Sequence, residues 1–305
     1  MKLAKLRVRP TFPIGPAPWP SSVPKPAEPS RTGVHYDTAW ARRWPARLAR
    51  AIVIDDLYRP LVQVLGSPRV TGLDRLADLE APVIFAANHH SHLDTPLVLT
   101  SLPKRFRHRT VVAAAADYFF SSRARGAVSA LTIGAIPIER TRVNRRSADL
   151  AADLLADGWS LVIFPEGGRS PDGWGQDFRG GAAYLAYRCG RPVVPVFVSG
   201  TRGVLKKGAK YPTPVGSPFA RGSGVAVAFG AALWPGEESS HRFAVRVENA
   251  VAAVGDEVTS DWWTARRRAA AGTTPALTGP ATSPWRRSWA LEENRRPAED
   301  TPDWP

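Results

Sequence analysis

Short apolar runs recur along the middle of the chain and alternate with segments of helical periodicity. The apolar runs cover residues 83–87, 110–114, 160–164, 193–198 and 225–229. They are apolar on both faces, which is typical of strands covered by helices on each side of a sheet. Helical patterns lie between them at residues 95–101, 147–157, 181–188 and 240–258. This alternation predicts an α/β domain with a largely parallel central sheet over residues 67–258.

A different pattern precedes this body. Between residues 37 and 66, Trp40, Trp44, Leu48 and Ile52 recur every four residues, with arginines between them. The spacing predicts an amphipathic helix. Its apolar face has two possible partners, a membrane surface or the core of the domain itself, and the sequence leaves both open.

The two ends of the chain differ from the body in composition. Residues 1–36 are rich in Pro and poor in aliphatic residues, which predicts a disordered arm. Residues 259–305 form a tail rich in Trp and Arg. Trp and Arg together suit a lipid–water interface, where an amphipathic ring and a long cationic side chain are both favourable. The alternative is a tail that clamps the folded domain through its Trp side chains.

Charge points to anionic partners without choosing among them. The 41 Lys and Arg residues exceed the 27 Asp and Glu residues, so the formal net charge is +14. Such a field attracts nucleic acid, anionic lipid or phosphorylated substrates. We expect no nucleic-acid partner, because no RNA- or DNA-binding motif is recognisable and the aromatic residues do not alternate with Lys and Arg on a strand.

Several other classes are disfavoured. No charge-free apolar stretch reaches the roughly 20 residues of a spanning helix, so we expect no transmembrane helix. The first residues lack the apolar core of a signal peptide, so secretion is not expected. Cys189 is the single cysteine, which rules out an internal disulfide and agrees with a reducing compartment.

The segment 88-NHHSHLD-94 contains three histidines and an aspartate directly after an apolar run. It matches the His-x-His-x-Asp beginning of the zinc motif of metallo-β-lactamase-like hydrolases. Thr95 stands where that motif has another His, and only His35, His108 and His241 lie elsewhere in the chain. A catalytic zinc site usually needs three protein ligands, so we expect no metal.

The same segment also fits a general base with an orienting carboxylate. Asp94 and His89 are about 140° apart on a regular helix and on opposite faces of a strand, so they meet only through a turn between the two. His90 is four residues before Asp94 and pairs more easily on a plain helix. Local geometry therefore does not decide whether His89 or His90 is the base that pairs with Asp94. A third interpretation is a polar turn in which Asp94 and its neighbours cap the helix at 95–101.

Four segments in the same order resemble the four sequence blocks of the glycerophospholipid acyltransferase family. They are 88-NHHSHLD-94, 134-GAIPIER-140, 164-FPEGGRS-170 and 193-VVPVFVSG-200. Each segment is short, and the match is specific because all four follow in order. It covers the body of the chain and neither tail.

The resemblance implies a role for each block. It assigns His89 as the general base and Asp94 as its orienting acid, with no catalytic role for His90 or His92. Arg140 is expected to hold the phosphate of the acceptor. Glu166, Gly167 and Arg169 are expected around the phosphate and glycerol of the same acceptor. The fourth block is expected to be a wall of the acyl site or a core strand.

Two positions depart from the family pattern. Gly168 stands where the family usually has Thr or Ser, and Pro137 stands where an aromatic residue is common. Neither position belongs to the expected catalytic pair. Gly168 removes one hydroxyl from the expected acceptor site.

The function implied by the resemblance is an O-acyltransferase. It moves a fatty acyl group from a thioester donor, coenzyme A or carrier protein, to the free hydroxyl of a lysophospholipid-type acceptor. Lysophosphatidic acid, converted to phosphatidic acid, is the expected acceptor, and another lysophospholipid or a glycolipid is the alternative. No metal or organic cofactor is implied beyond the donor. We expect a peripheral protein on the cytoplasmic face of the cell membrane, bound to an anionic surface.

Overall fold

The fold is centred on one sheet. The computed structural model describes residues 32–140, 145–215 and 224–293. Within them, seven strands lie in the order β1-β7-β6-β2-β5-β3-β4. All neighbouring strands are parallel except β6 and β7. Their bounds are β1 Arg69–Thr71, β2 Ile84–Ala87, β3 Thr110–Ala115, β4 Ala135–Ile138, β5 Ser160–Ile163, β6 Val193–Ser199 and β7 Ala226–Phe229. The predicted α/β class with a largely parallel sheet is confirmed.

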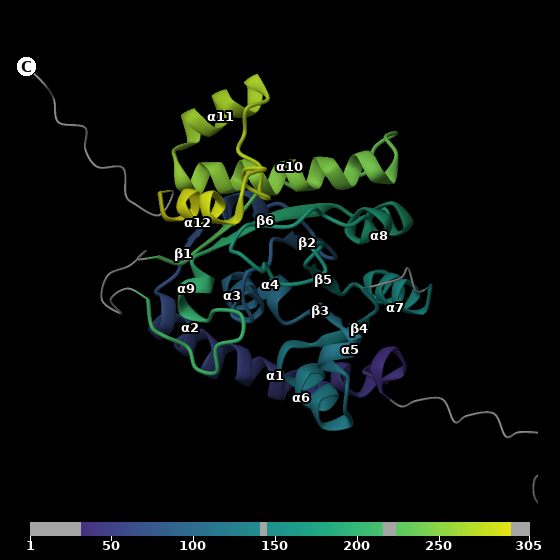
Figure 1. The fold of residues 1–305 in the computed structure, drawn as a ribbon. Coiled ribbons are helices and arrows are strands. Elements are labelled where there is room, and N and C mark those ends of the chain that lie inside the picture. Colours follow the sequence, from purple (N-terminus) through teal and green to yellow (C-terminus); the bar gives the residue numbers. More distant parts are fainter. Residues whose placement is uncertain (1–31, 141–144, 216–223, 294–305) are drawn as a thin grey trace, which may run out of the picture. The chain divides into compact units, whose positions relative to one another are not determined.

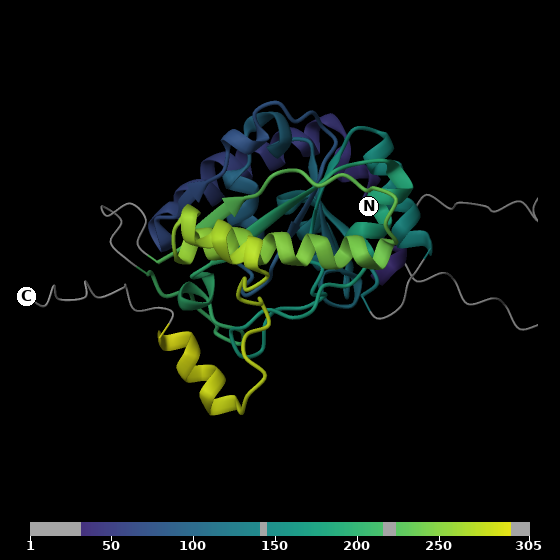
Figure 2. The same ribbon diagram turned by 90° about the horizontal axis from the view of Figure 1, so that it is seen from above.

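Helices cover both faces of this sheet (Figure 1). One face carries α1 Trp44–Ile52, η3 Val53–Tyr58, α2 Arg59–Gly66, α3 Asp94–Ser101, α4 Lys104–Arg107 and α6 Arg123–Ile133. The other face carries α7 Arg145–Ala156, α8 Gly181–Cys189 and the long α10 Ser240–Thr259, which lies across the strands in Figure 2. Successive side chains of a strand alternate between the faces. Phe85 accordingly joins the core on the α3 side, whereas Ile84 and Ala86 join the core beneath α7, α8 and α10.

Two strands have no counterpart in the sequence prediction, and each lies at an edge of the sheet. β1 is short and alternates between exposed and half-buried positions. β4 lies within the apolar run 126–138, whose first part is helix α6. Gly134, at φ +66°, ends that helix and turns the chain into β4. An apolar run of this kind does not distinguish helix from strand by periodicity. Pro137 is tolerated in β4 because an edge strand has one unpaired side.

The predicted amphipathic segment begins with a 3-10 turn, η2 Ala39–Arg42. After the extended residue Arg43 it is helical over residues 44–66, with a π-helical stretch, η3, in its middle. Its apolar residues divide between two surfaces. Ile54, Val62 and Leu65 enter the core. Trp44 is 71% exposed, and with it Leu48, Ile52, Leu57, Leu61 and Val64 form an exposed apolar stripe along the segment. The repeat that predicted the helix therefore faces outward from Trp44 to Ile52 and is not packed on the core.

The structure describes part of each predicted end segment. Residues 1–31 of the predicted disordered arm lie outside the described residues. Residues 33–35 form a 3-10 turn, and the Gly33 N–H donates to the carbonyl of Phe120, so the ordered chain begins before residue 37. The tail contains two helices, α11 Trp262–Ala271 and α12 Pro284–Glu293. Asp261 caps α11, because its side chain accepts the Thr264 N–H at 3.0 Å. An Asp at this position is a sequence signal for the start of a helix, and the sequence analysis did not use it.

Among the described helices, none combines the length and the apolar composition that crossing a bilayer requires.

Candidate active site

The residues singled out by the sequence lie beyond the carboxyl ends of the strands. His89 follows β2, Arg140 follows β4, and Glu166 and Arg169 follow β5. These three strands are parallel, so their carboxyl ends lie on the same side of the sheet. In open α/β sheets, ligands bind in the crevice beyond the carboxyl ends of the strands. The sheet therefore gathers three of the four sequence blocks around one place.

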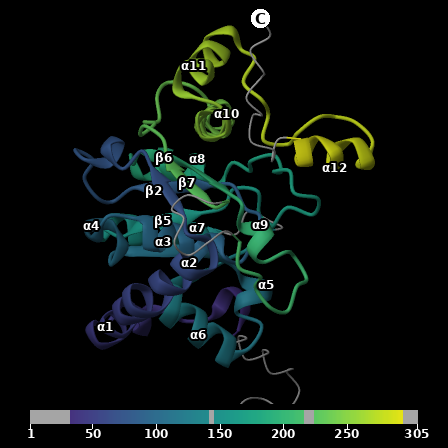
Figure 3. The same ribbon diagram turned by 90° about the vertical axis from the view of Figure 1, so that its left-hand side faces the viewer.

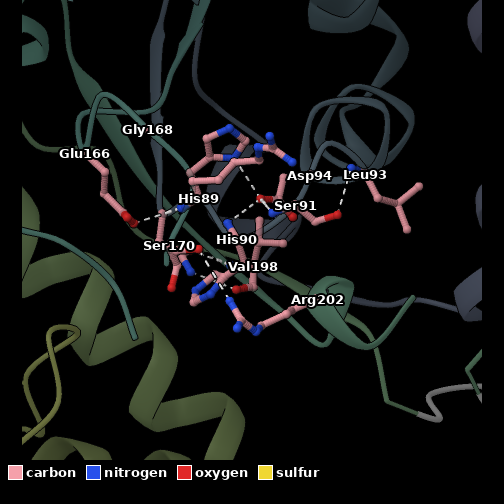
Figure 4. A network of polar contacts seen from close by, with 12 residues as sticks. His89, His90, Ser91, Leu93, Asp94, Glu166, Gly168, Ser170, Val198 and Arg202 are labelled. Carbon is pink, nitrogen blue, oxygen red and sulfur yellow. Dashed lines mark hydrogen bonds and ion pairs between the residues drawn. The ribbon is translucent and has the colours of Figure 1, made fainter. Parts of the chain in front are cut away.

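His89 and Asp94 are in contact. Asp94 is the first residue of α3, and its Oδ2 lies 2.8 Å from Nδ1 of His89. The same oxygen accepts the backbone N–H groups of His90 at 2.6 Å and Ser91 at 2.8 Å (Figure 4). The turn between β2 and α3 thus wraps around one carboxylate oxygen. His89 pairs through its side chain and His90 through its backbone, which resolves the alternative that spacing left open.

The turn is fixed to the sheet by Asn88. Its side-chain amide donates to the Val198 carbonyl at 2.8 Å, and its side-chain oxygen accepts the Val198 N–H at 2.7 Å. Asn88 is fully buried, and Val198 belongs to the neighbouring strand β6. The two bonds satisfy both backbone groups of one strand residue and hold the start of the turn in register. Pro195, in the fourth block, is a buried residue of the same strand, so this block is a core strand.

Asp94 is a buried carboxylate that stays charged. Burial alone opposes its charge, but hydrogen bonds from His89 and Ser91 hold the pKa of Asp94 below its ordinary value. The Thr201 hydroxyl also lowers this pKa. A charged Asp94 can stabilise an imidazolium at His89.

Glu166 supports the backbone of His89. Its Oε1 accepts the His89 N–H at 2.8 Å, and its Oε2 accepts the Gln176 N–H at 3.1 Å. The residue is only 2% exposed, and burial raises the pKa of Glu166 to about 8. Both oxygens are engaged by backbone, and Glu166 does not line the cavity described below. Glu166 thus holds the backbone of His89 and Gln176 outside the cavity, and its expected contact with the acceptor stays a prediction.

The rings of His92 and His89 stack on different aromatic side chains. The His92 ring stacks on Tyr118, with 5.5 Å between ring centroids. Burial and the neighbouring Arg169 and His89 lower the pKa of His92 to about 4, so its imidazole is neutral at physiological pH. His89 stacks on Phe164 at 4.2 Å, which holds the plane of its ring. Within the described part of the chain, no group of three His, Cys, Asp or Glu side chains has the arrangement of a metal site.

A cavity of about 750 Å³ opens beside His89. Its interior is apolar and lies between the sheet and the helices α7 and α8. The residues that line this part include Val112, Ala113, Ala151, Leu161, Ile163 and Leu185. The polar part of the lining contains His89 and four cationic side chains, those of Arg140, Arg169, Arg179 and Lys207. Glu139 is the acidic residue in the lining. The cavity therefore combines an apolar interior with a cationic region beside the His89 imidazole.

The four cations differ in their partners. Arg140 pairs with Asp117 at 2.6 Å, at the surface. Among the residues that the structure describes, Arg169, Arg179 and Lys207 form no ion pair with an acidic side chain. An anionic ligand is the natural partner of such cations, and the paired N–H groups of arginine suit phosphate oxygens.

Arg179 and Lys207 were missed by the sequence analysis. Lys207 donates to the Arg169 carbonyl at 3.1 Å, and Arg179 donates to the Arg140 carbonyl. Each joins the site through a backbone contact between segments far apart in the chain, which leaves no local pattern. Gly167 makes room for Arg179, because a Cβ on Gly167 would lie 3.0 Å from the guanidinium carbon. Its φ of +72° is a second reason for glycine there.

A family model and a solved structure are similar to this chain. Residues 67–199 match the family model described as Acyltransferase. The solved structure of the 1-acyl-sn-glycerophosphate acyltransferase PlsC from Thermotoga maritima has the same fold, with a TM-score of 0.54 and 22% identity. The likeness covers 71% of this chain and 84% of that one.

Curated relatives are similar over about half of the chain. The chain is 31% identical over 143 residues to a chloroplastic 1-acyl-sn-glycerol-3-phosphate acyltransferase of Arabidopsis thaliana. It is 29% identical over 167 residues to the chloroplastic enzyme of that name from Brassica napus. The matches cover 46% and 54% of this chain, and 38% and 44% of those relatives. The chain thus spans less than half the length of the curated relatives it matches.

Proposed function

We propose that the protein is an O-acyltransferase that esterifies a lysophospholipid-type acceptor, with lysophosphatidic acid converted to phosphatidic acid. The observation that carries this proposal is the His89–Asp94 pair at a cavity with an apolar interior and four cationic side chains, of which only Arg140 has an acidic partner among the described residues. A base, a place for a fatty chain and a place for a phosphate are the three requirements of such a reaction. The names of the matched relatives support the same activity.

The residues divide the proton transfer between them. Asp94 engages Nδ1 of His89, which leaves Nε2 as the basic nitrogen. Nε2 takes the proton of the acceptor hydroxyl as its oxygen attacks the thioester carbonyl carbon. The carbon–sulfur bond then breaks, and the thiolate takes the proton back from the imidazolium. Asp94 stabilises that imidazolium throughout, and the products are an ester and a free thiol.

The acceptor is held by its phosphate. Arg140 and Arg169 come from different sequence blocks and line the same cavity, as do Arg179 and Lys207. Within the described residues, Arg169, Arg179 and Lys207 form no ion pair with an acidic side chain, so a phosphomonoester bound there supplies the anion that these three cations lack. Charge-assisted hydrogen bonds are roughly twice as strong as neutral ones, so the phosphate contributes much of the acceptor's binding energy. The acyl chain of the donor occupies the apolar interior, and the donor thioester needs no metal or further cofactor.

The proposed location is the surface of an anionic membrane, as a peripheral protein on the cytoplasmic face. The exposed stripe from Trp44 to Val64 supports this location, because Trp, Leu and Ile side chains are rarely aligned on a helix surface without an apolar partner. The net charge of +14 adds attraction to anionic lipid. Both substrates of the proposed reaction are amphiphiles found at such a surface.

One experiment tests the activity and its acceptor. A single labelled acyl-CoA is offered with lysophosphatidic acid, with a lysophospholipid that carries a larger head group, and with a neutral monoacylglycerol. We expect transfer chiefly to lysophosphatidic acid. Preference for the neutral acceptor contradicts the phosphatidic acid assignment but leaves an acyltransferase. No transfer to any hydroxyl acceptor from either coenzyme A or carrier-protein donors contradicts the proposal as a whole.

The remaining alternative is a zinc hydrolase. Asp94 Oδ2, which that motif requires as a ligand, already accepts three N–H groups. Activity that survives EDTA and 1,10-phenanthroline is expected. Stoichiometric zinc whose removal abolishes turnover contradicts the acyltransferase mechanism.

A further inference from the structure

The loop between β5 and α8 carries Glu166 and Arg169 and is attached to His89 from within. The Ser170 N–H donates to the His89 carbonyl at 2.9 Å, while Glu166 accepts the His89 N–H. Both backbone groups of the proposed base are thus bound by one short stretch of this loop. Ser170 is fully buried and its hydroxyl accepts the Gly173 N–H at 2.7 Å. The next residues, 172–175, are bound by the C-terminal segment.

The outer contact comes from the C-terminal helix α12. The Arg287 guanidinium donates from Nε at 2.9 Å and from Nη2 at 2.8 Å to Oδ2 of Asp172. The carbonyl of Arg287 accepts the indole N–H of Trp174 at 3.0 Å. One residue of α12 therefore binds the loop through both its side chain and its backbone. Figure 3 shows α12 apart from α10 and α11, on the side of the sheet where α5 (Ala116–Phe119) and α9 (Thr201–Val204) follow their strands.

The segment before α12 makes a second contact. The Gly175 N–H donates to the Leu277 carbonyl at 2.9 Å. Gly279 lies against the Trp174 ring so closely that a Cβ would stand 2.2 Å from a ring atom. Trp174 is consequently enclosed by Gly279 on its face and by Arg287 at its N–H. The exposed tail tryptophans, Trp285 and Trp289, make none of these contacts.

We propose that residues 273–293 are a clamp that orders the 166–176 loop and so sets the affinity of the site for its anionic acceptor. The clamp lies outside the matched residues 67–199. Arg287 and Gly279 are positioning residues in this scheme, because they act on Arg169 through the loop and do not touch the cavity. Holding a loop in its binding conformation before the ligand arrives removes an ordering cost from binding. The readout of this proposal rests on the proposed function.

The first test removes the ion pair. Arg287→Ala should raise the KM for lysophosphatidic acid roughly three- to tenfold, the effect of one charge-assisted contact at a half-exposed position. The donor KM and the slow hydrolysis of acyl-CoA without acceptor should stay unchanged. Arg286→Ala is the matched control, since Arg286 is exposed and stacks on Trp285. The charge exchange Asp172→Arg with Arg287→Asp should recover most of the lost affinity.

The second test uses two glycines of the same tail. Gly279 and Gly272 both have positive φ, +69° and +67°, so alanine strains the backbone similarly at each. A Cβ on Gly272 meets nothing within 4 Å, whereas a Cβ on Gly279 collides with Trp174. Gly279→Ala should therefore raise the acceptor KM, and Gly272→Ala should leave it near the wild-type value.

Hydrogen exchange supplies a readout that is independent of catalysis. Amides of residues 170–176 should exchange faster in Arg287→Ala and Gly279→Ala than in the wild type and both controls. Unchanged exchange overturns the clamp, and so does faster exchange with an unchanged acceptor KM. If the wild type transfers no acyl group to any acceptor, the proposed function fails, while exchange still decides whether the segment orders the loop.

Discussion

Glu166 accepts the backbone N–H of His89 at 2.8 Å, across 77 residues of sequence. The contact joins the block that supplies the proposed base to the block that supplies the glycine turn and Arg169. It also explains why a carboxyl group is buried there, because backbone donors at both oxygens compensate part of its lost hydration. The compensation is incomplete, and the pKa of Glu166 rises to about 8.

The raised pKa of Glu166 predicts a pH-dependent stability. The folded protein keeps a proton on Glu166 up to about pH 8, whereas the unfolded chain loses it near the ordinary value of 4.5. Unfolding between these values releases a proton, so this group makes the free energy of unfolding fall as pH rises through that window. Glu166→Gln stays neutral and should lose less stability between pH 5 and pH 8. Urea midpoints at several pH values measure the difference.

Glu166→Gln also has a cost at low pH. The NH2 group of the new Gln side chain takes the place of Oε2 and cannot accept the Gln176 N–H. The free energy of unfolding should therefore fall by about 1 kcal/mol at pH 5. The difference in the free energy of unfolding between the wild type and Glu166→Gln should then narrow or change sign by pH 8. Glu237→Gln, at an exposed position, is the control. Parallel pH profiles of the wild type and Glu166→Gln contradict the assignment of a buried, protonated carboxyl.

Substitution of His89 and of its neighbour His90 gives the sharpest test of the mechanism. His89→Ala should lower kcat by the ~10²–10⁴-fold typical of a lost general base. His90→Ala keeps the backbone N–H that Asp94 accepts, so its effect should be small. Steady-state kinetics with one acceptor and one donor measure both. A large loss at His90 with a mild one at His89 contradicts the assignment of the base.

The sequence predicted the strands in the middle of the sheet better than its edges. Central strands are covered on both faces and give separate apolar runs. At the edges, β1 is partly exposed, and β4 shares one apolar run with helix α6. The His89–Asp94 pair could be named only through the family blocks. Its geometry depends on a turn whose N–H groups converge on one oxygen, and spacing alone does not specify that turn. The role of Glu166 depends on tertiary burial, which no local pattern reveals.

Gly168 offers a test of the departure from the family pattern. A Cβ on Gly168 meets nothing within 4 Å, and the residue lines the cavity. Gly168→Ser should therefore fold with unchanged stability and place a hydroxyl beside the acceptor. We expect a shift in the relative kcat/KM of the acceptors with the donor KM unchanged. Thermal unfolding and the acceptor panel measure the two parts, and a marked loss of stability contradicts the open space found at Gly168.

The exposed stripe predicts membrane binding that depends on both apolar contact and charge. Leu48→Glu combined with Ile52→Glu removes two exposed apolar side chains and should abolish most sedimentation with anionic vesicles. Val245→Glu, exposed on α10 across the sheet, is the control. High salt should weaken wild-type binding, because each basic residue near the surface contributes about 1 kcal/mol that salt screens. Wild-type binding by the double variant contradicts this surface, and retention after carbonate extraction contradicts peripheral attachment.

The two family arginines predict how the acceptor phosphate is held. Arg140→Ala and Arg169→Ala should each lower the kcat/KM for lysophosphatidic acid by about tenfold or more, the loss of a charge-assisted contact, with the donor KM nearly unchanged. Lys at either position keeps the charge but loses the paired N–H geometry, so its effect should be smaller. Arg188→Ala is the control, because Arg188 pairs with Asp149 at 2.7 Å and does not line the cavity.

A neutral acceptor completes the test of these arginines. Without a phosphate it should be a poor substrate for the wild type and nearly indifferent to either substitution, since it has no anion for the guanidinium groups to bind. Equal losses on the phosphate-bearing and the neutral acceptor show that Arg140 and Arg169 support the fold or the donor. That outcome contradicts a phosphate site at this part of the cavity, while the His89–Asp94 pair stays available for acyl transfer to a different hydroxyl.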